Sequence, residues 1–152
     1  MASPRKKLSR LVNLRTQQKG IRQVLGDLEA DIMEQVWQES PASVRDVHER
    51  IAKKRTIAYT TVMTVMSRLA EKGLLKREQR GRAFLYAPVQ TRDEFCSDAI
   101  STVMRGLLGG FGEPVLSNFV ETVGSEDEAK LDELIRLIEA KKGNAKPSVT
   151  SP

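Results

Sequence analysis

The sequence is poor in the side chains that bind metals and form disulfides. Among its 152 residues it has one cysteine, Cys96, and one histidine, His48. One cysteine cannot form a disulfide within the chain, and such low usage is typical of proteins from a reducing compartment. One cysteine and one histidine are also too few for a Cys/His zinc site. We therefore predict a cytoplasmic protein with no metal site and no cofactor.

Long apolar runs and catalytic motifs are missing as well. The chain has no stretch of 18 apolar residues, so we expect no insertion into a membrane. The basic N-terminus lacks the apolar segment of a secretory signal peptide. No nucleophile–base pair is apparent, and the glycine run at 109–112 is not followed by the Gly-Lys-Ser/Thr of a phosphate-binding loop. These absences argue against an enzyme.

Positive charge is present in excess and is concentrated in the first part of the chain. The net charge is +5. Residues 1–26 carry seven Lys or Arg and no acid, residues 27–90 carry eleven basic and nine acidic residues, and residues 91–142 carry six basic and eleven acidic residues. This asymmetry predicts that the first part binds a polyanion and that the second has another role. A generic basic protein with solvated charges is the alternative.

We interpret residues 1–26 as a basic N-terminal arm. Two glycines, Gly20 and Gly26, interrupt its apolar pattern. Such an arm can follow DNA phosphates or enter a minor groove. A disordered tail that only improves solubility and an organelle transit peptide are the alternatives. The basic residues of this arm are Arg5, Lys6, Lys7, Arg10, Arg15, Lys19 and Arg22.

The stretch from Ala58 to Gly73 is predicted to be a helix with two distinct faces. The opposite side of its apolar stripe carries hydroxyl groups rather than the Glu–Lys pairs of an ordinary solvated helix. Hydroxyls can contact base edges and phosphate oxygens, and threonine methyls can contact thymine. We interpret it as a DNA-recognition helix, with a plain amphipathic helix as the alternative. The stripe is Val62, Val65, Met66 and Leu69, and the other face has Thr60, Thr61, Met63, Thr64, Ser67 and Arg68.

Two helices are predicted before the recognition helix. Residues 27–38 have an apolar face, and the only tryptophan, Trp37, is assigned to the core. Ser43 and Asp46 have the spacing of a capping box at the start of a second helix, in which His48 is assigned to the surface. A basic turn leads to the third helix, and this order predicts a helix-turn-helix. The cations of this turn, expected to contact phosphates, are Lys53, Lys54 and Arg55.

Residues 74–88 are predicted to form a β-hairpin after the recognition helix. Alternating residues lead into a charged turn around Gly81, and Pro88 closes the second strand. A helix-turn-helix followed by such a hairpin is a winged helix. We expect Arg80 and Arg82 at the wing tip to enter the minor groove or to hold phosphates, with an ordinary exposed turn as the alternative.

Residues 91–142 are predicted to form three helices, each apolar on one side. The first begins at Thr91 and ends at Gly109-Gly110, the second has Pro114 near its start, and the third begins at Ser125. One-sided helices of this length cannot bury all their apolar residues alone, so we predict that this segment forms a homodimer. Residues 143–152 are predicted to be a disordered tail. The residues expected at the dimer interface are Phe95, Ala99, Val103, Leu107, Val115, Phe119, Leu131, Leu134, Ile135 and Ile138.

Four segments resemble the penicillinase-repressor family: LGDLEADIMEQVW, SVRDV, AYTTVMTVMSRLAEKGLLKRE and GRAFLYAP. The resemblance covers about residues 25–140. The family includes repressors of β-lactamase and methicillin-resistance genes and copper-responsive repressors. It implies an N-terminal winged helix, a C-terminal helical dimerisation domain, and repression by dimers that bind a palindromic operator in double-stranded DNA.

The resemblance also implies roles for single residues. Family members contact DNA through the positions of Thr60, Thr61, Met63, Thr64 and Arg68. Some members are inactivated through a membrane sensor-protease pathway that leads to cleavage of an Asn-Phe bond, and Asn118-Phe119 lies in the matching segment. An ordinary polar residue followed by a core residue is the alternative reading of this pair.

Cys96 bears on which branch of the family the chain resembles. The copper-responsive branch has a cluster of cysteines near its C-terminus, which this sequence lacks. A copper or zinc switch of that type is therefore not expected. A lone cysteine beside Phe95 is either buried in the fold or a redox sensor.

The sequence thus predicts a mainly α protein with a small β-hairpin wing, made of a winged helix at 27–90 and a helical dimerisation domain at 91–142. The predicted function is a homodimeric, sequence-specific transcriptional repressor. A winged helix that binds DNA without sequence preference, or that binds another protein, is the alternative. The salt dependence of binding to specific and scrambled duplexes distinguishes these functions.

Overall fold

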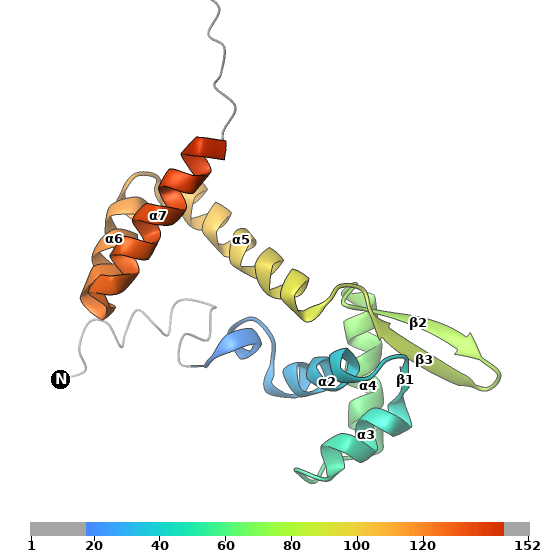
Figure 1. Cartoon of the computed structure of the whole chain (residues 1–152). Coiled ribbons are helices and arrows are strands. Elements are labelled where there is room, and N and C mark those ends of the chain that lie inside the picture. Colours follow the sequence, from blue (N-terminus) through green and yellow to red (C-terminus); the bar gives the residue numbers. More distant parts are fainter. Residues whose placement is uncertain (1–17, 145–152) are drawn as a thin grey trace, which may run out of the picture. The chain divides into compact units, whose positions relative to one another are not determined.

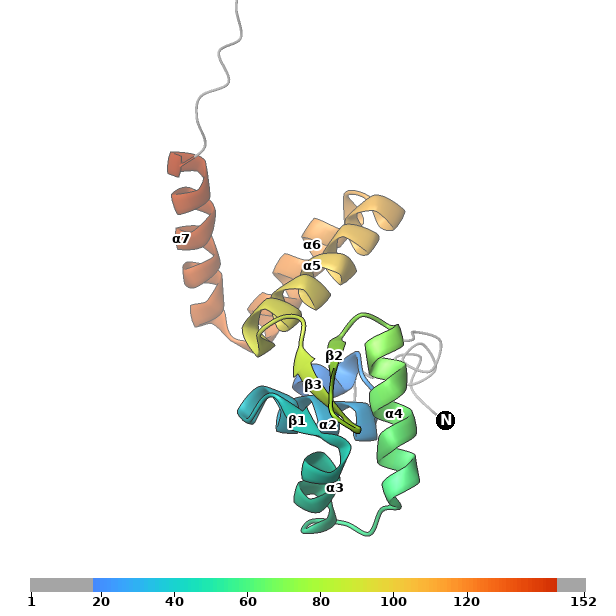
Figure 2. The ribbon, with the colours of Figure 1, turned by 90° about the vertical axis from the view of Figure 1, so that its right-hand side faces the viewer.

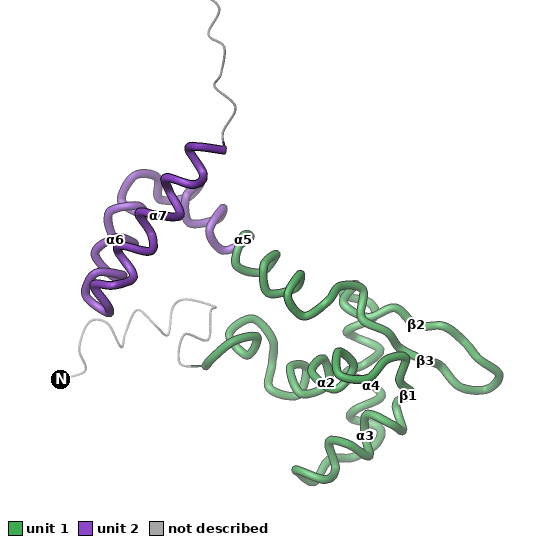
Figure 3. The backbone as a smooth tube through the Cα atoms, viewed as in Figure 1, with its two compact units in different colours: residues 1–101 green, residues 102–152 purple. Residues whose placement is uncertain are grey.

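The computed structural model describes residues 18–144 (Figure 1). Two compact units, residues 1–101 and 102–152, are described separately (Figure 3). In chain order the elements are η1 (Gly20–Gln23), α2 (Asp27–Gln38), β1 (Ala42–Ser43), α3 (Val44–Ala52), α4 (Tyr59–Glu71), β2 (Leu75–Arg80), β3 (Ala83–Pro88), α5 (Arg92–Phe111), α6 (Pro114–Glu126) and α7 (Glu128–Asn144).

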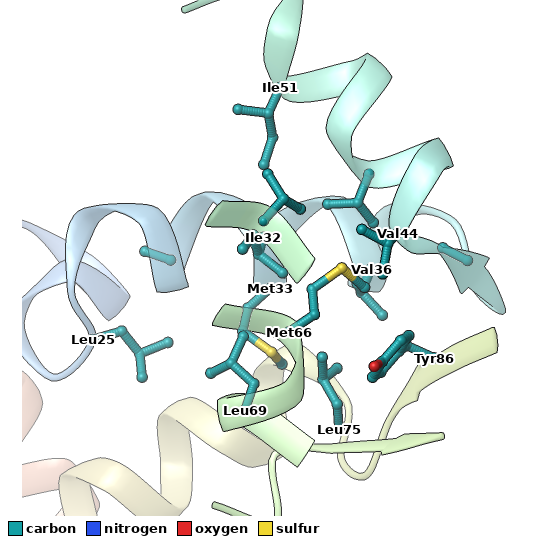
Figure 4. Close-up of a cluster of buried hydrophobic side chains, with 14 of the residues drawn as sticks. Leu25, Ile32, Met33, Val36, Val44, Ile51, Met66, Leu69, Leu75 and Tyr86 are labelled. Atoms are coloured by element: carbon teal, nitrogen blue, oxygen red, sulfur yellow. The ribbon is translucent and has the colours of Figure 1, made fainter. Parts of the chain in front are cut away.

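The first unit packs three helices and a small sheet around one apolar core (Figure 4). Each helix contributes the stripe that its spacing predicts, for example Ile32, Met33 and Val36 from α2. From the sheet, Leu75 of β2 and Tyr86 of β3 enter the same core. Helix α4 is thereby held through its buried side, by Val62, Met66 and Leu69.

The sheet is antiparallel, with strand order β1-β3-β2. β2 and β3 form the predicted hairpin, in which Leu75 pairs with Pro88 and Arg80 pairs with Ala83. The first turn residue, Gly81, has a φ of 64°, a conformation that glycine adopts without steric cost. The winged-helix fold predicted from the sequence is therefore confirmed.

The ends of α3 and α4 have the local structure that their residues predict. The Ser43 hydroxyl accepts a bond from the Asp46 N–H (3.1 Å), and the Asp46 carboxylate accepts one from the Ser43 N–H (2.9 Å), which completes a capping box. At the end of α4, Gly73 has a φ of 79°. The Leu74 N–H donates to the Leu69 carbonyl (2.9 Å), as in a Schellman motif. This tight stop places β2 directly beside α4.

The predicted boundary between an arm at 1–26 and the winged helix is too late in the chain. Ile21 is 4% exposed and Leu25 6% exposed, and both lie in the core of the first unit. Ile21 lies in the short helix η1, and Leu25 follows it, with its N–H bonded to the Ile21 carbonyl at 2.9 Å. Residues 1–17 of the predicted arm lie outside the described residues.

The helix limits in the second unit also differ from those predicted. α5 continues through Gly109 and Gly110 to Phe111, α6 ends at Glu126, and α7 begins at Glu128. α6 packs on α7, and a Cβ added to Gly124 would lie 3.0 Å from Leu131 Cδ1. Of the predicted tail, residues 143 and 144 belong to α7, and residues 145–152 lie outside the described part of the chain.

The helices α5, α6 and α7 bury no residue completely in the single chain. Several large apolar side chains are instead exposed, among them Phe111 at 71% and Ile135 at 52%. Among residues 18–144, no helix combines the length and the apolar character needed to span a membrane.

Candidate nucleic-acid interface

The exposed face of α4 carries the side chains predicted to read DNA. Thr60, Thr61, Thr64 and Arg68 are exposed, Met63 is 42% exposed, and Ser67 is half-buried. The helix limits fix this arrangement, because the buried residues of α4 follow the 3.6-residue period and leave the hydroxyl-bearing positions on the other side. The structure therefore brings all six residues to one side of a single helix.

The Thr64 hydroxyl has a defined direction. It donates to the Thr60 carbonyl oxygen at 2.9 Å. Because its proton is used within the helix, the hydroxyl oxygen faces outward as an acceptor, and the methyl group stands beside it. An acceptor in this place suits an amino group on a base edge, such as adenine N6 or cytosine N4.

The three cations of the basic turn before α4 are all exposed, and one of them is ion-paired within the chain. Lys53 and Lys54 are exposed. Arg55 is also exposed, but its Nη1 lies 3.1 Å from the carboxylate of Asp31 on α2. We predicted Arg55 as a phosphate contact, and the structure shows that it has an ionic partner in its own chain.

Arg22, assigned to the arm by the sequence, shares the same carboxylate. It bonds to Asp31 and lies 3.5 Å from the Asp27 carboxylate. The bond to Asp31 raises the pKa of Arg22 above its ordinary value. The Arg22–Asp31–Arg55 cluster therefore joins η1 to α2 and to the turn before α4, and its first role is structural.

His48 also has a different place from the predicted one. It was assigned to the surface, yet it is half-buried, and its Nε2 lies 2.9 Å from the Ile57 carbonyl oxygen. Its ring meets the ring of Tyr59 edge-on, with the centroids 5.7 Å apart. His48 thus connects α3 to the last residues before α4 and to its first residue, Tyr59. No periodic pattern in the sequence indicates this contact.

The wing lies beside α4 (Figures 1 and 2). It carries cations on its first strand as well as at its tip. Arg80 and Arg82 are exposed at the turn, as predicted. Two further cations of β2, Lys76 and Arg77, line a groove between β2 and α4. The sequence does not distinguish them from other charged residues, because alternating charges on a hairpin are common on solvated surfaces.

The predicted interface residues of the C-terminal helices have different surroundings. Phe95 stacks on Trp37 of the same chain, with ring centroids 5.5 Å apart, and it packs against the core with Cys96. Ala99, Val103, Val115, Leu131 and Leu134 are half-buried, whereas Leu107, Phe119, Ile135 and Ile138 are exposed. Phe95 is therefore explained by packing within the first unit. Cys96 itself is half-buried.

Asn118 and Phe119, the candidate cleavage pair, lie within α6. The Asn118 side-chain amide donates to the Pro114 carbonyl at 2.8 Å. Both residues line an apolar groove between the end of α5 and α6, together with Met104, Leu107 and Phe111. In residues 18–144, His, Cys, Asp and Glu side chains form no group of three or more that could hold a metal ion.

The family model and two similar proteins of known name indicate the same family. The penicillinase-repressor profile matches residues 25–139. The transcriptional regulator BlaI of Mycobacterium tuberculosis strain H37Rv is 39% identical over 126 residues, which are 82% of this chain and 91% of that protein. The penicillinase repressor of Bacillus licheniformis is 25% identical over 122 residues, 80% of this chain and 94% of that one.

A solved structure of the same kind is also similar to this chain. The solution structure of the DNA-binding domain of the repressor BlaI has 32% sequence identity and a TM-score of 0.41, and the match covers 48% of this chain and 88% of that one. Since the family profile spans most of the sequence and a relative exceeds one-third identity over most of both chains, this chain belongs to the penicillinase-repressor family.

Proposed function

We propose that this chain is a homodimeric transcriptional repressor of the cytoplasm that binds a palindromic operator in double-stranded DNA. The family is one of transcriptional repressors and not of enzymes. The observation that carries the proposal is the exposed hydroxyl-rich face of α4 beside a cationic wing. Major-groove readout needs such a helix, and phosphate contacts from Lys53, Lys54, Arg80 and Arg82 supply affinity and orientation.

Dimerisation is supported by the apolar surface of the second unit. Phe111, Leu116 and Leu137 are 71%, 61% and 62% exposed, on helices that bury no residue completely in the single chain. Exposed apolar surface of this kind is typical of a protein–protein interface. A second copy offers the same surface and a closed two-fold arrangement. A two-fold dimer presents its two recognition helices to two half-sites, and this is why the operator is expected to be palindromic.

Relief of repression by cleavage at Asn118-Phe119, through a membrane sensor-protease pathway, is part of the same proposal. The bond lies inside α6 and beside the exposed ring of Phe119. A protease binds its substrate in an extended form, so α6 has to unwind locally before it is cut. The cut separates α7 from α5 and thereby weakens two-site binding.

The test is footprinting of the wild-type protein on the DNA upstream of its own gene, over a salt series, with a scrambled duplex as control. A protected palindrome, with preference for it over the scramble, is the expected result. Equal and salt-sensitive binding to both duplexes would replace the proposal with a winged helix that binds DNA without sequence preference.

A further inference from the structure

The groove between α4 and β2 lies next to the proposed recognition surface. Its lining residues include Lys76 and Arg77, two cations to which no role in that surface has been given. Ser67, Ala70 and Glu71 line it from the helix. Leu75, Lys76 and Arg77 line it from the strand. The lining residues therefore include two cations, Lys76 and Arg77, one hydroxyl and a single carboxylate, that of Glu71. Thr64 and Arg68 of the proposed recognition surface lie on the same helix, α4.

The position of Arg77 follows from the strand. Leu75 enters the core, and in a strand the second residue on points to the same face, so Arg77 emerges on the side turned toward α4. Leu75 at the base and Arg77 farther out thus lie along one wall of the groove. Arg77 pairs with Tyr86 across the hairpin, and Gln79 pairs with Phe84. Phe84 is therefore the diagonal neighbour of Arg77 on this face.

Phe84 holds the Arg77 guanidinium in place. The guanidinium carbon lies 4.7 Å from the centre of the Phe84 ring, and Phe84 remains 41% exposed. A phenylalanine with so much surface in water gains little from burial, yet stacking keeps a planar guanidinium in one orientation and leaves its N–H groups available. An ordered cation at a groove wall binds an anion with a smaller loss of side-chain entropy.

The geometry of B-DNA indicates which anion would lie there. When α4 enters a major groove and the wing tip reaches the neighbouring minor groove, one sugar–phosphate strand crosses between them. That strand would therefore pass over the groove between α4 and β2. We propose that this groove binds a phosphate of that strand through Arg77, assisted by the Ser67 hydroxyl, and that Phe84 orients Arg77 for this contact. The inference rests on the proposed DNA-binding function.

Salt-dependent binding of point variants tests the proposal. The variant is Arg77→Gln, and the matched control is Arg136→Gln on α7, which removes the same charge from an exposed site in the second unit. Arg77→Gln should bind about eightfold more weakly in 0.1 M salt and lower the slope of log K against log salt by about 0.9. The loss should be the same on the operator duplex and on its scramble, because a phosphate has no sequence.

Phe84→Leu tests the orienting role. Alone it should weaken binding severalfold, and in the Arg77→Gln background it should have no further effect, since the residue that it orients is gone. An additive loss in the double variant overturns the role of Phe84. If the salt slope of Arg77→Gln equals that of the control, the proposal that the groove binds a phosphate is overturned. Thermal unfolding of each variant shows whether the winged helix is intact.

The same titrations separate this proposal from the proposed function. A wild-type protein without preference for the operator over the scramble overturns sequence-specific repression, while the groove still predicts the change in slope on either duplex. If the wild-type protein prefers the operator and the salt slope of Arg77→Gln is unchanged, only the proposal of a phosphate site in the groove is overturned. A wild-type protein that binds neither duplex overturns both.

Discussion

At the scale of the residue, Thr64 is the position where chemistry is most closely defined. Its proton is donated to the Thr60 carbonyl, so its oxygen is left to act as a hydrogen-bond acceptor. The sequence predicted an exposed threonine here but not the direction of its hydroxyl, which depends on the backbone bond within α4.

Replacing Thr64 with valine keeps the shape and the methyl group and removes the acceptor. We expect Thr64→Val to cost about 1–3 kcal/mol of binding free energy at one base pair of the operator, because a base donor is left unpaired. Binding to a set of duplexes with single base changes measures this. A loss of equal size on every duplex would reassign Thr64 to a backbone contact.

Asp46 is a second residue with a defined electrostatic role. Its carboxylate accepts bonds from the Ser43 N–H and from the Ser43 hydroxyl at 2.9 Å and 2.7 Å, and these bonds lower its pKa below the ordinary value. A carboxyl whose pKa falls on folding stabilises the protein above the unfolded-state pKa of about 3.9. This contribution is lost as the pH falls through the lower, folded-state pKa.

Asp46→Ala should therefore lower the free energy of unfolding by about 0.5–2 kcal/mol near neutral pH. The difference in unfolding free energy between wild type and variant should begin to narrow below about pH 4, where the unfolded chain takes up the proton, and should close once the pH is below the lowered, folded-state pKa of Asp46. Urea unfolding at several pH values measures both effects. Glu49→Ala, on the exposed side of the same helix, is the control and should show a smaller change; an Asp46→Ala gap that is independent of pH would contradict the argument.

At the scale of the element, the sequence predicted the winged helix better than the helices after it. The stripes of α2, α3 and α4 and the alternation of the hairpin are strong local signals. By contrast, α5 passes through Gly109 and Gly110, because a glycine weakens a helix by only about 1 kcal/mol and neighbouring turns can compensate. Ile21 was missed because a single turn of η1 has no period to read.

In the candidate site too, a local pattern predicts some residues and leaves others out. The exposed face of α4 follows from its stripe and was predicted from the sequence. The contacts of His48 with Ile57 and of Arg77 with Phe84 join separate elements, and no local pattern indicates them. Phe95 was predicted to face a partner because its helix is apolar on one side; in the single chain its ring lies 5.5 Å from that of Trp37 and it is half-buried, a contact that no local pattern indicates.

The contact between α6 and α7 offers a test at this scale. A Cβ at Gly124 would lie 3.0 Å from Leu131 Cδ1, whereas a Cβ at Gly106 in α5 would meet no atom within 4 Å. Gly106→Ala should stabilise the chain by about 0.5–1 kcal/mol through helix propensity. Gly124→Ala should gain nothing, because Leu131 must move. Denaturant unfolding compares them, and an equal gain at both sites would show that Leu131 yields freely.

At the scale of the whole molecule, the two units differ in how they bury apolar surface. The first has a core of its own, with Ile32, Val36 and Val62 at 0% exposure. The second has helices with exposed apolar faces. This difference is the reason that we expect the first unit to fold without a partner and the second to depend on protein concentration.

Ile135→Asp should prevent dimer formation, because Ile135 is 52% exposed on α7 in the single chain and a buried carboxylate would destabilise the interface. Sedimentation should show a monomer, and operator affinity should fall by about two orders of magnitude or more through loss of two-site binding. Arg136→Asp places the same carboxylate on the next residue of α7 and should remain dimeric. A dimeric Ile135→Asp protein would move the interface elsewhere.

The N-terminal cations give a second test at this scale, and the structure determines where the chain is to be cut. Because Ile21 belongs to the core, a deletion should end at residue 17 rather than extend to the predicted boundary at 26. Deleting residues 1–17 removes Arg5, Lys6, Lys7, Arg10 and Arg15. Affinity for DNA and the salt slope should both fall if these cations release counterions. An unchanged slope would mean that the segment does not meet DNA.

Trp37 gives the molecule a built-in optical label. It is the only tryptophan in the chain, its indole N–H donates to the Gln90 carbonyl at 2.9 Å, and its ring lies against Phe95 at the start of α5. The emission of an indole shifts to longer wavelength when it enters water. The intrinsic fluorescence of the unmodified protein therefore reports whether the first turns of α5 stay docked on α2, and it can follow operator binding or proteolysis in real time without a dye.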